Sequence, residues 1–176
     1  MSRIRPVQVT DLPAIRDIYN HFVRTSTVTF DEKETEPESW LHKYELLAES
    51  GLPFLAAVDD DGDREVLLGF AYAQHWRAKS AYRFSAEDTI YLAPHAAGRG
   101  LGKALLQALL DASVAAGLRE IIAVIEPTAA EASIALHRRY GFEDAGRLRN
   151  VGVKFGRSLD VVFLQKSLPA GVSDRG

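Results

Sequence analysis

A glycine-rich segment at residues 98–102 is the feature that most constrains how this chain can fold. Residues 82–92 before it form a candidate strand, and the run KALLQALLDASVAAG after it is a strong helix pattern that Gly117 ends. Glycine lets backbone N–H groups approach an anion closely, and the N-terminus of a helix adds partial positive charge. The segment therefore predicts a loop that binds a phosphate or pyrophosphate, and a purely structural turn is the alternative.

The other patterns place this unit in a single α/β domain, which is usual for 176 residues. Further helices are expected over residues 11–24, 37–51 and 129–140. Further strands are expected over residues 4–9, 53–58, 66–76 and 121–125, with two more between 142 and 168. Residues 25–30 form a loop or a strand, and residues 169–176 a flexible tail, so residues 1–168 make up the domain.

Composition excludes several classes of site. The chain has no cysteine, which excludes disulfides, thiolate–zinc sites, iron–sulfur clusters and a cysteine nucleophile. None of its five histidines lies three or four residues from another, so no metal site is expected. The net charge of −3 argues against a nucleic-acid partner. Neither a signal peptide nor a long apolar run occurs in the sequence, so we expect a cytoplasmic protein with no membrane partner.

The spacing of the glycine-rich segment excludes the two most familiar phosphate loops. A P-loop requires glycine and serine or threonine where Ala97 and Ala104 stand. A dinucleotide-binding loop requires glycine at the position of Lys103. Residues 97–102 instead fit the pattern Q/R-x-x-G-x-G/A from the glycines onward, with Ala97 at the leading position.

With this loop the chain resembles the GNAT superfamily, and within it the phosphinothricin and methionine sulfoximine N-acetyltransferase group. The resemblance covers nearly the whole chain, and the order and spacing of its motifs are together specific. These motifs are DIYNH at 17–21, WR at 76–77, AYR at 81–83, EDTIY at 87–91, the glycine loop, ASIALH at 132–137, GF at 141–142, GVKFGR at 152–157 and LD at 159–160. The resemblance implies a twisted, mixed sheet of six or seven strands flanked by helices, an α/β (α+β) fold. It also implies a homodimer, and a role in antibiotic or herbicide resistance.

Two positions depart from the family pattern. The asparagine that usually contacts the cofactor at the start of the helix near residue 130 is Ala130 here. The tryptophan that usually follows Phe-Gly-Arg is Ser158, which bears on the acceptor pocket or the dimer surface.

The resemblance places acetyl-CoA where two central strands splay apart. Residues 90–92 match the strand that pairs with the pantetheine arm, and the N–H of Leu92 is a candidate oxyanion donor. Ser133 matches a cofactor contact on the following helix. The complete set of expected cofactor residues is Ile90, Tyr91, Leu92, Gly98, Arg99, Gly100, Leu101, Gly102, Lys103 and Ser133.

Amine acetylation requires a base for the ammonium proton, an oxyanion site and a proton for the departing thiolate. Without cysteine, an acetyl-cysteine intermediate is impossible, so direct attack on acetyl-CoA is favoured. The resemblance makes Glu87 the general base, whereas Asp88 points to the opposite face of a regular strand. For the thiolate proton, Tyr140 matches the usual position and is favoured over His137, which lies one turn earlier.

A carboxylate or phosphinate acceptor would be bound by cations, and arginine can bind such a group through two hydrogen bonds. The expected cations are Arg77, Arg83 and Lys154, and the expected aromatic walls are Trp76, Tyr82, Phe30 and Phe155.

The predicted function is transfer of an acetyl group from acetyl-CoA to the α-amine of a small amino-acid analogue, with phosphinothricin, methionine sulfoximine and methionine sulfone as examples. A protein N-terminus, a lysine or a polyamine is the alternative acceptor, although Arg77 and Arg83 argue against a polycation. An acyl-CoA-binding module without catalytic activity is the alternative from another class. Glu87 and Tyr140 argue against that module.

Overall fold

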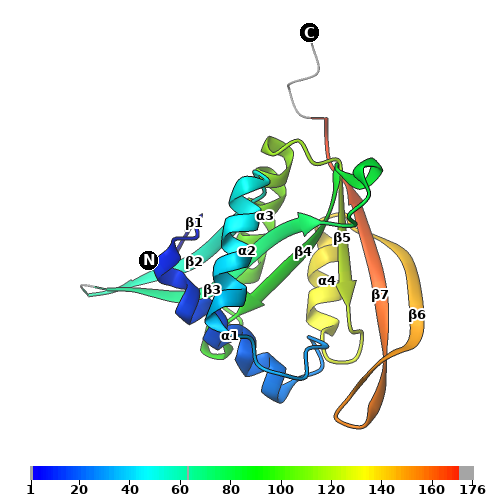
Figure 1. Cartoon of the computed structure of the whole chain (residues 1–176), viewed down its shortest axis with the longest axis horizontal. Coiled ribbons are helices and arrows are strands. Elements are labelled where there is room, and N and C mark those ends of the chain that lie inside the picture. The colour runs from blue at the N-terminus through cyan, green and yellow to red at the C-terminus, as the bar shows by residue number, and fades with distance from the viewer. Residues whose placement is uncertain (1, 63, 171–176) are drawn as a thin grey trace.

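A mixed sheet in the order β1-β2-β3-β4-β5-β7-β6 forms the framework of the protein (Figure 1). The computed structural model describes residues 2–62 and 64–170, and seven strands of these residues make up the sheet. The strands are β1 (Arg3–Pro6), β2 (Phe54–Asp61), β3 (Arg64–His75), β4 (Ser85–Leu92), β5 (Glu120–Ile125), β6 (Glu143–Lys154) and β7 (Arg157–Ser167).

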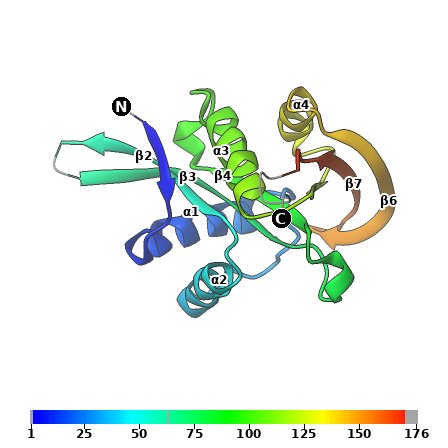
Figure 2. The same cartoon turned by 90° about the horizontal axis from the view of Figure 1, so that it is seen from above.

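Helices cover both faces of the sheet. Figure 2 shows α1 (Leu12–Thr25) and α2 (Pro37–Glu49) below it, and α3 (Leu101–Ala115) and α4 (Glu131–Arg139) above it. Short 3₁₀ turns precede α1, β4 and α3, at Val9–Asp11, Ser80–Tyr82 and Pro94–Ala96. The predicted single α/β domain with a mixed sheet of six or seven strands is therefore confirmed.

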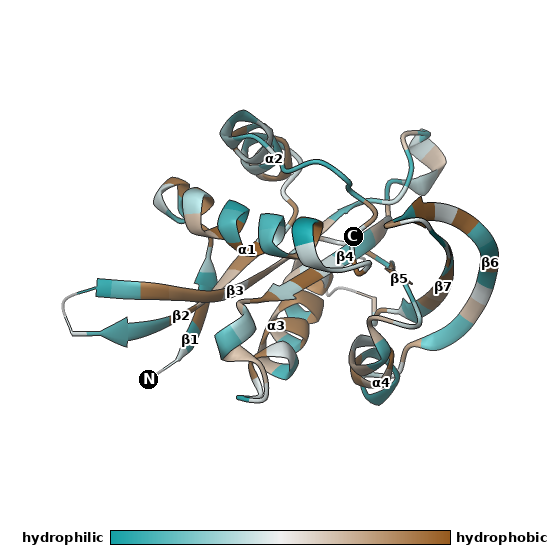
Figure 3. Ribbon diagram, turned by 90° about the horizontal axis from the view of Figure 1, so that it is seen from below, coloured by the Kyte–Doolittle hydropathy of each residue, from teal (hydrophilic) through white to brown (hydrophobic). Residues whose placement is uncertain are grey.

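The core lies between α3 and the central strands. Leu105, Leu106 and Leu109 of α3 are fully buried, and Phe70 and Ala71 of β3 are fully buried as well. Because β3 is covered on both faces, its middle residues form a continuous buried run instead of alternating. Figure 3 shows the same hydrophobic colouring along β3 and α3. This packing fixes the N-terminus of α3, and with it the glycine-rich segment, beside the central strands.

Several element boundaries differ from the predicted ones. The first strand ends at Pro6 rather than at residue 9, and the 3₁₀ turn Val9–Asp11 follows it. The strand expected from residue 82 begins at Ser85, since the 3₁₀ turn Ser80–Tyr82 precedes it. The fourth helix begins at Glu131 rather than at residue 129, and ends one residue before Tyr140. Of the tail expected over residues 169–176, residues 171–176 lie outside the described part of the chain.

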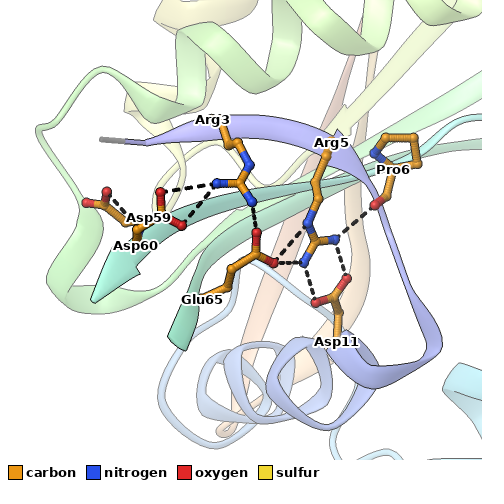
Figure 4. Close-up of polar contacts among 7 residues, drawn as sticks. All are labelled: Arg3, Arg5, Pro6, Asp11, Asp59, Asp60 and Glu65. Atoms are coloured by element: carbon orange, nitrogen blue, oxygen red, sulfur yellow. Dashed lines mark hydrogen bonds and ion pairs between the residues drawn. The ribbon is translucent and has the colours of Figure 1, made fainter. Parts of the chain in front are cut away.

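An ion-pair network ties the sheet edge to the start of α1 (Figure 4). Arg5 donates to Asp11 at 2.7 Å and to Glu65 at 2.7 Å, and Arg3 contacts Asp60 and Glu65. The Arg3–Asp60 pair is exposed, and pairs of this kind contribute about 0–1 kcal/mol each, whereas the Arg5–Asp11 pair is part-buried. Together they fasten β1 to its neighbours. Among the residues described, no helix has both the length and the apolar character needed to cross a bilayer.

Candidate active site

The central strands β4 and β5 diverge and leave a cavity between them. They pair in parallel only at Ser85, Ala86 and Glu87 of β4, and Glu87, opposite Ile122, is the last paired residue. Beyond this point a cavity of about 750 Å³ is lined by both strands, by the start of α4 and by residues 28–30 of the loop that follows α1. The divergence leaves one edge of β4 without a strand partner from residue 88 onward within the described chain.

The free edge of β4 presents backbone amides to the cavity. On the other edge, the N–H of Ala93 donates to the carbonyl of Leu68 at 2.8 Å. Alternate amides of a strand point to opposite edges, so the N–H groups of Leu92 and Ile90 point away from β3. Ile90, Tyr91 and Leu92, the residues expected from the resemblance to accompany a pantetheine arm, all line the cavity.

The glycine-rich segment forms the turn into α3 at the mouth of this cavity. Gly98 and Gly100 have φ of 80° and 77°, the left-handed region that glycine adopts without strain, and Gly100 is the N-cap of α3. Gly102 lines the cavity, and a Cβ there would contact Leu136 at 3.4 Å. The segment thus brings backbone and a helix N-terminus to the cavity, an arrangement that suits a pyrophosphate.

The charged side chains of this loop point elsewhere. Arg99 donates to Asp59 of β2 at 2.7 Å, and the side chain of Lys103 is exposed. Leu101 is buried in the core. The backbone, rather than these side chains, therefore supplies the loop's contribution to an anion site in this arrangement.

Glu87 lies at the vertex of the diverging strands and lines the cavity. Burial, followed by the negative charge of the neighbouring Asp88, raises the pKa of the Glu87 carboxyl, while Lys43 and Arg77 oppose the shift. A carboxylate with a raised pKa is a stronger base for an ammonium proton.

Asp88 and His137 form a buried pair beside Glu87. The Nε2 atom of His137 lies 2.8 Å from Oδ2 of Asp88, and its Nδ1 atom lies 2.7 Å from the carbonyl of Ser133. Burial alone lowers the pKa of His137, but the hydrogen bond and charge of Asp88, with the Ser133 carbonyl, outweigh it and raise the pKa. Asp88, Ser133 and His137 all line the cavity, so the wall of the cavity contains an imidazole whose charged form is favoured. The sequence predicts Asp88 only as a residue on the strand face opposite Glu87, and its contact with His137, 49 residues away, has no local signal.

Tyr140 does not line this cavity. It follows the last turn of α4, and its hydroxyl donates to the carbonyl of Lys103 at 3.1 Å. The structure therefore separates the two predicted proton donors, with His137 in the cavity wall and Tyr140 against α3.

The predicted acceptor residues Trp76, Arg77, Tyr82 and Arg83 lie outside the cavity lining. The Arg77 guanidinium stacks over Trp76 at 4.8 Å, and Trp76 packs edge-on against Phe163. Arg83 stacks over Phe84 and donates to the carbonyl of Ser80, and Tyr82 is exposed. Of these four residues, only Arg77 influences Glu87: its positive charge opposes the rise in the pKa of that carboxyl.

Lys154 and Phe155 also differ from the expected placement. Lys154 is 2% exposed, and its ammonium donates to the carbonyl of Thr29 at 2.8 Å instead of facing the cavity. Phe155 is 56% exposed in the turn between β6 and β7. Phe30, by contrast, lines the cavity as predicted.

Sequence reasoning did not identify two further polar groups of the cavity. Glu126, at the end of β5, is buried and accepts from the hydroxyl of Thr27 at 2.8 Å and from Thr128 and Ala129. Tyr19 of α1 hydrogen-bonds to Thr29 at 2.7 Å. The Glu126–Thr27 contact links residues 99 positions apart, so no local pattern signals it.

Residues 15–142 match the model of the acetyltransferase (GNAT) family. The chain belongs to this family. It is 43% identical over 168 residues to a phosphinothricin N-acetyltransferase from Alcaligenes faecalis, covering 96% of this chain and 83% of that protein. It is 40% identical to an L-methionine sulfoximine/L-methionine sulfone acetyltransferase from Pseudomonas aeruginosa, with 95% of each chain covered.

A solved GNAT structure has the same fold. The phosphinothricin acetyltransferase from Sinorhizobium meliloti, in complex with acetyl-CoA, superimposes with a TM-score of 0.90 at 37% identity, covering 99% of this chain and 92% of that one. The GNAT fold and the use of acetyl-CoA by this acetyltransferase are thereby established.

The residues present fit acetyl-CoA. The free edge of β4 and the glycine turn before α3 provide the backbone groups that suit a pantetheine arm and a pyrophosphate. No group of three His, Asp or Glu side chains that could hold a metal ion occurs in the described part of this GNAT domain.

Proposed function

We propose that the protein acetylates the α-amine of a small amino-acid analogue such as phosphinothricin, methionine sulfoximine or methionine sulfone, with Glu87 as general base. The observation that carries this proposal is the position of Glu87 at the vertex of the diverging strands, beside the free edge of β4. The names of the relatives at 43% and 40% identity support this class of acceptor.

Each step is assigned to residues of the cavity. Bound acetyl-CoA supplies an activated acetyl thioester. The Glu87 carboxylate takes the proton of the acceptor ammonium, directly or through water, and its raised pKa favours this transfer. The N–H of Leu92, which faces the gap between β4 and β5, is placed to donate to a developing oxyanion.

The proton for the departing thiolate is assigned to His137 in preference to Tyr140. His137 lines the cavity, and its contacts with Asp88 and Ser133 favour the charged ring. The protons of both candidates are directed to acceptors, that of Tyr140 to the carbonyl of Lys103 and those of His137 to Asp88 and Ser133. The preference therefore rests on position, because His137 lines the cavity and Tyr140 does not.

Arg77 and Arg83 remain the proposed partners of the acceptor's acidic groups. Both are exposed on the segment between β3 and β4, and Arg77 is close enough to Glu87 to affect its pKa. Their positive charge suits a carboxylate or phosphinate and disfavours a polyamine. Trp76, Tyr82 and Phe155 are the proposed aromatic surroundings.

We also propose that the active form is a homodimer. β6, an edge strand, exposes the apolar side chains of Leu148, Val151 and Val153, and the turn that follows it exposes Phe155. An edge strand with an apolar exposed face favours association. A second copy is the partner that the family resemblance implies.

Release of CoA from acetyl-CoA in the presence of candidate acceptors tests the proposal. Phosphinothricin, methionine sulfoximine and methionine sulfone should stimulate release, whereas a lysine peptide, a peptide with a free N-terminus and spermidine should not. Stimulation only by the peptides or spermidine would assign the alternative acceptors. Acetyl-CoA binding by calorimetry with no stimulation by any of these acceptors would indicate a binding module.

A further inference from the structure

The end of β6 contacts the loop that forms one wall of the cavity. Residues at alternate positions of a strand share a face, so Gly152 and Lys154 face one way while Val151 and Val153 face solvent. The turn after Lys154 fixes this arrangement. Phe155 and Gly156 have φ of 52° and 70°, as in a type I′ hairpin turn, and they place Lys154 opposite Arg157.

Lys154 reaches the loop through its ammonium group. This group donates to the backbone carbonyl of Thr29 at 2.8 Å, across 125 residues of sequence. A buried ammonium is costly unless it has a hydrogen-bond partner or an opposite charge nearby. The carboxylates of Asp31 and Glu32, on the same loop, supply that charge, although burial still lowers the pKa of Lys154.

Because Gly152 has no side chain, the loop packs directly against its backbone. A Cβ at this position would lie 2.4 Å from Cε2 and 2.6 Å from Cδ2 of Phe30. The ring of Phe30 therefore lies directly on the backbone of β6, and any larger residue at 152 would displace it.

The two loop residues held in this way belong to the cavity wall. Thr29 and Phe30 line the cavity, and the Thr29 hydroxyl hydrogen-bonds to Tyr19, which lines it too. The expected cofactor residues lie on β4, in the glycine turn, on α3 and, with Ser133, on α4, and none lies in residues 28–30. We therefore assign the wall formed by residues 28–30 to the acceptor.

We propose that Gly152 and Lys154 are positioning residues that hold Thr29 and Phe30 in place and so set the fit of the acceptor. The inference rests on the proposed function for the identity of the acceptor. It assigns Lys154 a role through the Thr29 carbonyl, in place of the direct contact with substrate that the sequence predicts.

Two variants perturb the contact from different sides. Lys154→Met keeps the apolar stem and removes the ammonium, and Gly152→Ala pushes against Phe30. Lys33→Met is the matched control, because Lys33 lies on the same loop and is exposed. All substitutions are made in the full-length protein.

Hydrogen–deuterium exchange reports how well the backbone amides of the loop are protected, and it requires no acceptor. Both variants should accelerate exchange of the peptide that covers residues 26–35 by about tenfold, because these contacts hold the loop against β6. The control should exchange like the wild type. Unchanged exchange in Lys154→Met and Gly152→Ala would overturn the proposal.

Steady-state kinetics then separate positioning from general damage. In both variants KM for the acceptor should rise about tenfold while KM for acetyl-CoA changes by less than about twofold. A parallel rise in both KM values would contradict the proposal. If the wild type turns over no acceptor of the panel, the proposed function fails, and the exchange result still decides whether β6 holds the loop.

A double-mutant cycle tests whether Gly152 acts through Phe30. Phe30→Ala removes the ring atoms that a Cβ at 152 would meet. In that background Gly152→Ala should cause no additional acceleration of exchange in residues 26–35. Additive effects would mean that Gly152 acts by another route and would overturn its assigned role.

Discussion

His137 and Asp88 are joined by a 2.8 Å contact between Nε2 and Oδ2, with both side chains buried in the wall of the cavity. The ring is oriented from its other side by the carbonyl of Ser133. Acceptors on both ring nitrogens favour the imidazolium form, because only that form has two N–H donors. The pair therefore favours a proton on the His137 ring in the wall of the cavity.

Replacement of Asp88 by Asn should lower the pKa of His137, and the loss of stability should depend on pH. Because the folded-state pKa is raised above 6.5, the pair's stabilisation is fully present below about pH 6.5 and is lost as pH rises through the folded value. The free energy of unfolding of the variant should therefore fall further below that of the wild type at pH 6 than at pH 9.

NMR titration of the histidine ring protons, together with denaturant unfolding at the two pH values, measures both effects. An unchanged titration midpoint for His137 would remove Asp88 as the cause of its raised pKa.

Glu87→Gln should reduce kcat by about 10²–10⁴-fold, which is the usual contribution of a positioned base. KM for acetyl-CoA should stay near the wild-type value, because Glu87 is not part of the glycine turn. In the wild type, kcat/KM should fall as pH is lowered through a pKa above 4.5, and this limb should disappear in the variant.

Initial rates of CoA release between pH 5 and pH 9 provide the measurement. Glu38→Gln is the matched control, since this carboxylate is exposed on α2. Full activity of Glu87→Gln would rule out Glu87 as the base.

Much of the fold could be predicted because its signals are local. The helix of α3 has closely spaced leucines and glycines at both ends, and β5 is a short apolar run between turns. The glycine turn and the position of Glu87 on the strand before it could also be predicted from the sequence, because both belong to a motif with a fixed order along the chain. The ends of the elements were predicted less accurately. The 3₁₀ turn Ser80–Tyr82, for example, has residues that also suit the start of a strand.

The parts of the site that sequence did not predict depend on tertiary pairing. Lys154 carries the residue type expected of an anion ligand, and only the packing of β6 against residues 28–30 directs its ammonium to Thr29. The Glu126–Thr27 contact joins residues 99 positions apart. Neither contact produces a periodic pattern in the sequence, because each involves a single side chain on each of the two segments.

Gly100→Ala should raise KM for acetyl-CoA and leave KM for the acceptor unchanged. Its φ of 77° is strained for any L-residue, at a cost of about 1 kcal/mol or more, and relief of that strain moves the turn before α3. Gly62→Ala is the matched control, since it has φ of 64° in the β2–β3 turn and open space around it. Both variants should lose similar stability in thermal unfolding, but only Gly100→Ala should weaken cofactor binding. An equal change of KM for acetyl-CoA in both would show that the turn has no special role.

Val153→Glu should convert the proposed homodimer into a monomer. Val153 is 65% exposed on the outward face of β6, and burying a carboxylate at the centre of an apolar interface without a partner is costly. Sedimentation equilibrium should give twice the chain mass of 19.4 kDa for the wild type and the single mass for the variant. Val66→Glu makes the same change on β3, where Val66 is 37% exposed, and should leave the dimer intact. If both variants sediment as the wild type does, the outward face of β6 is not the interface, and its apolar side chains need another explanation.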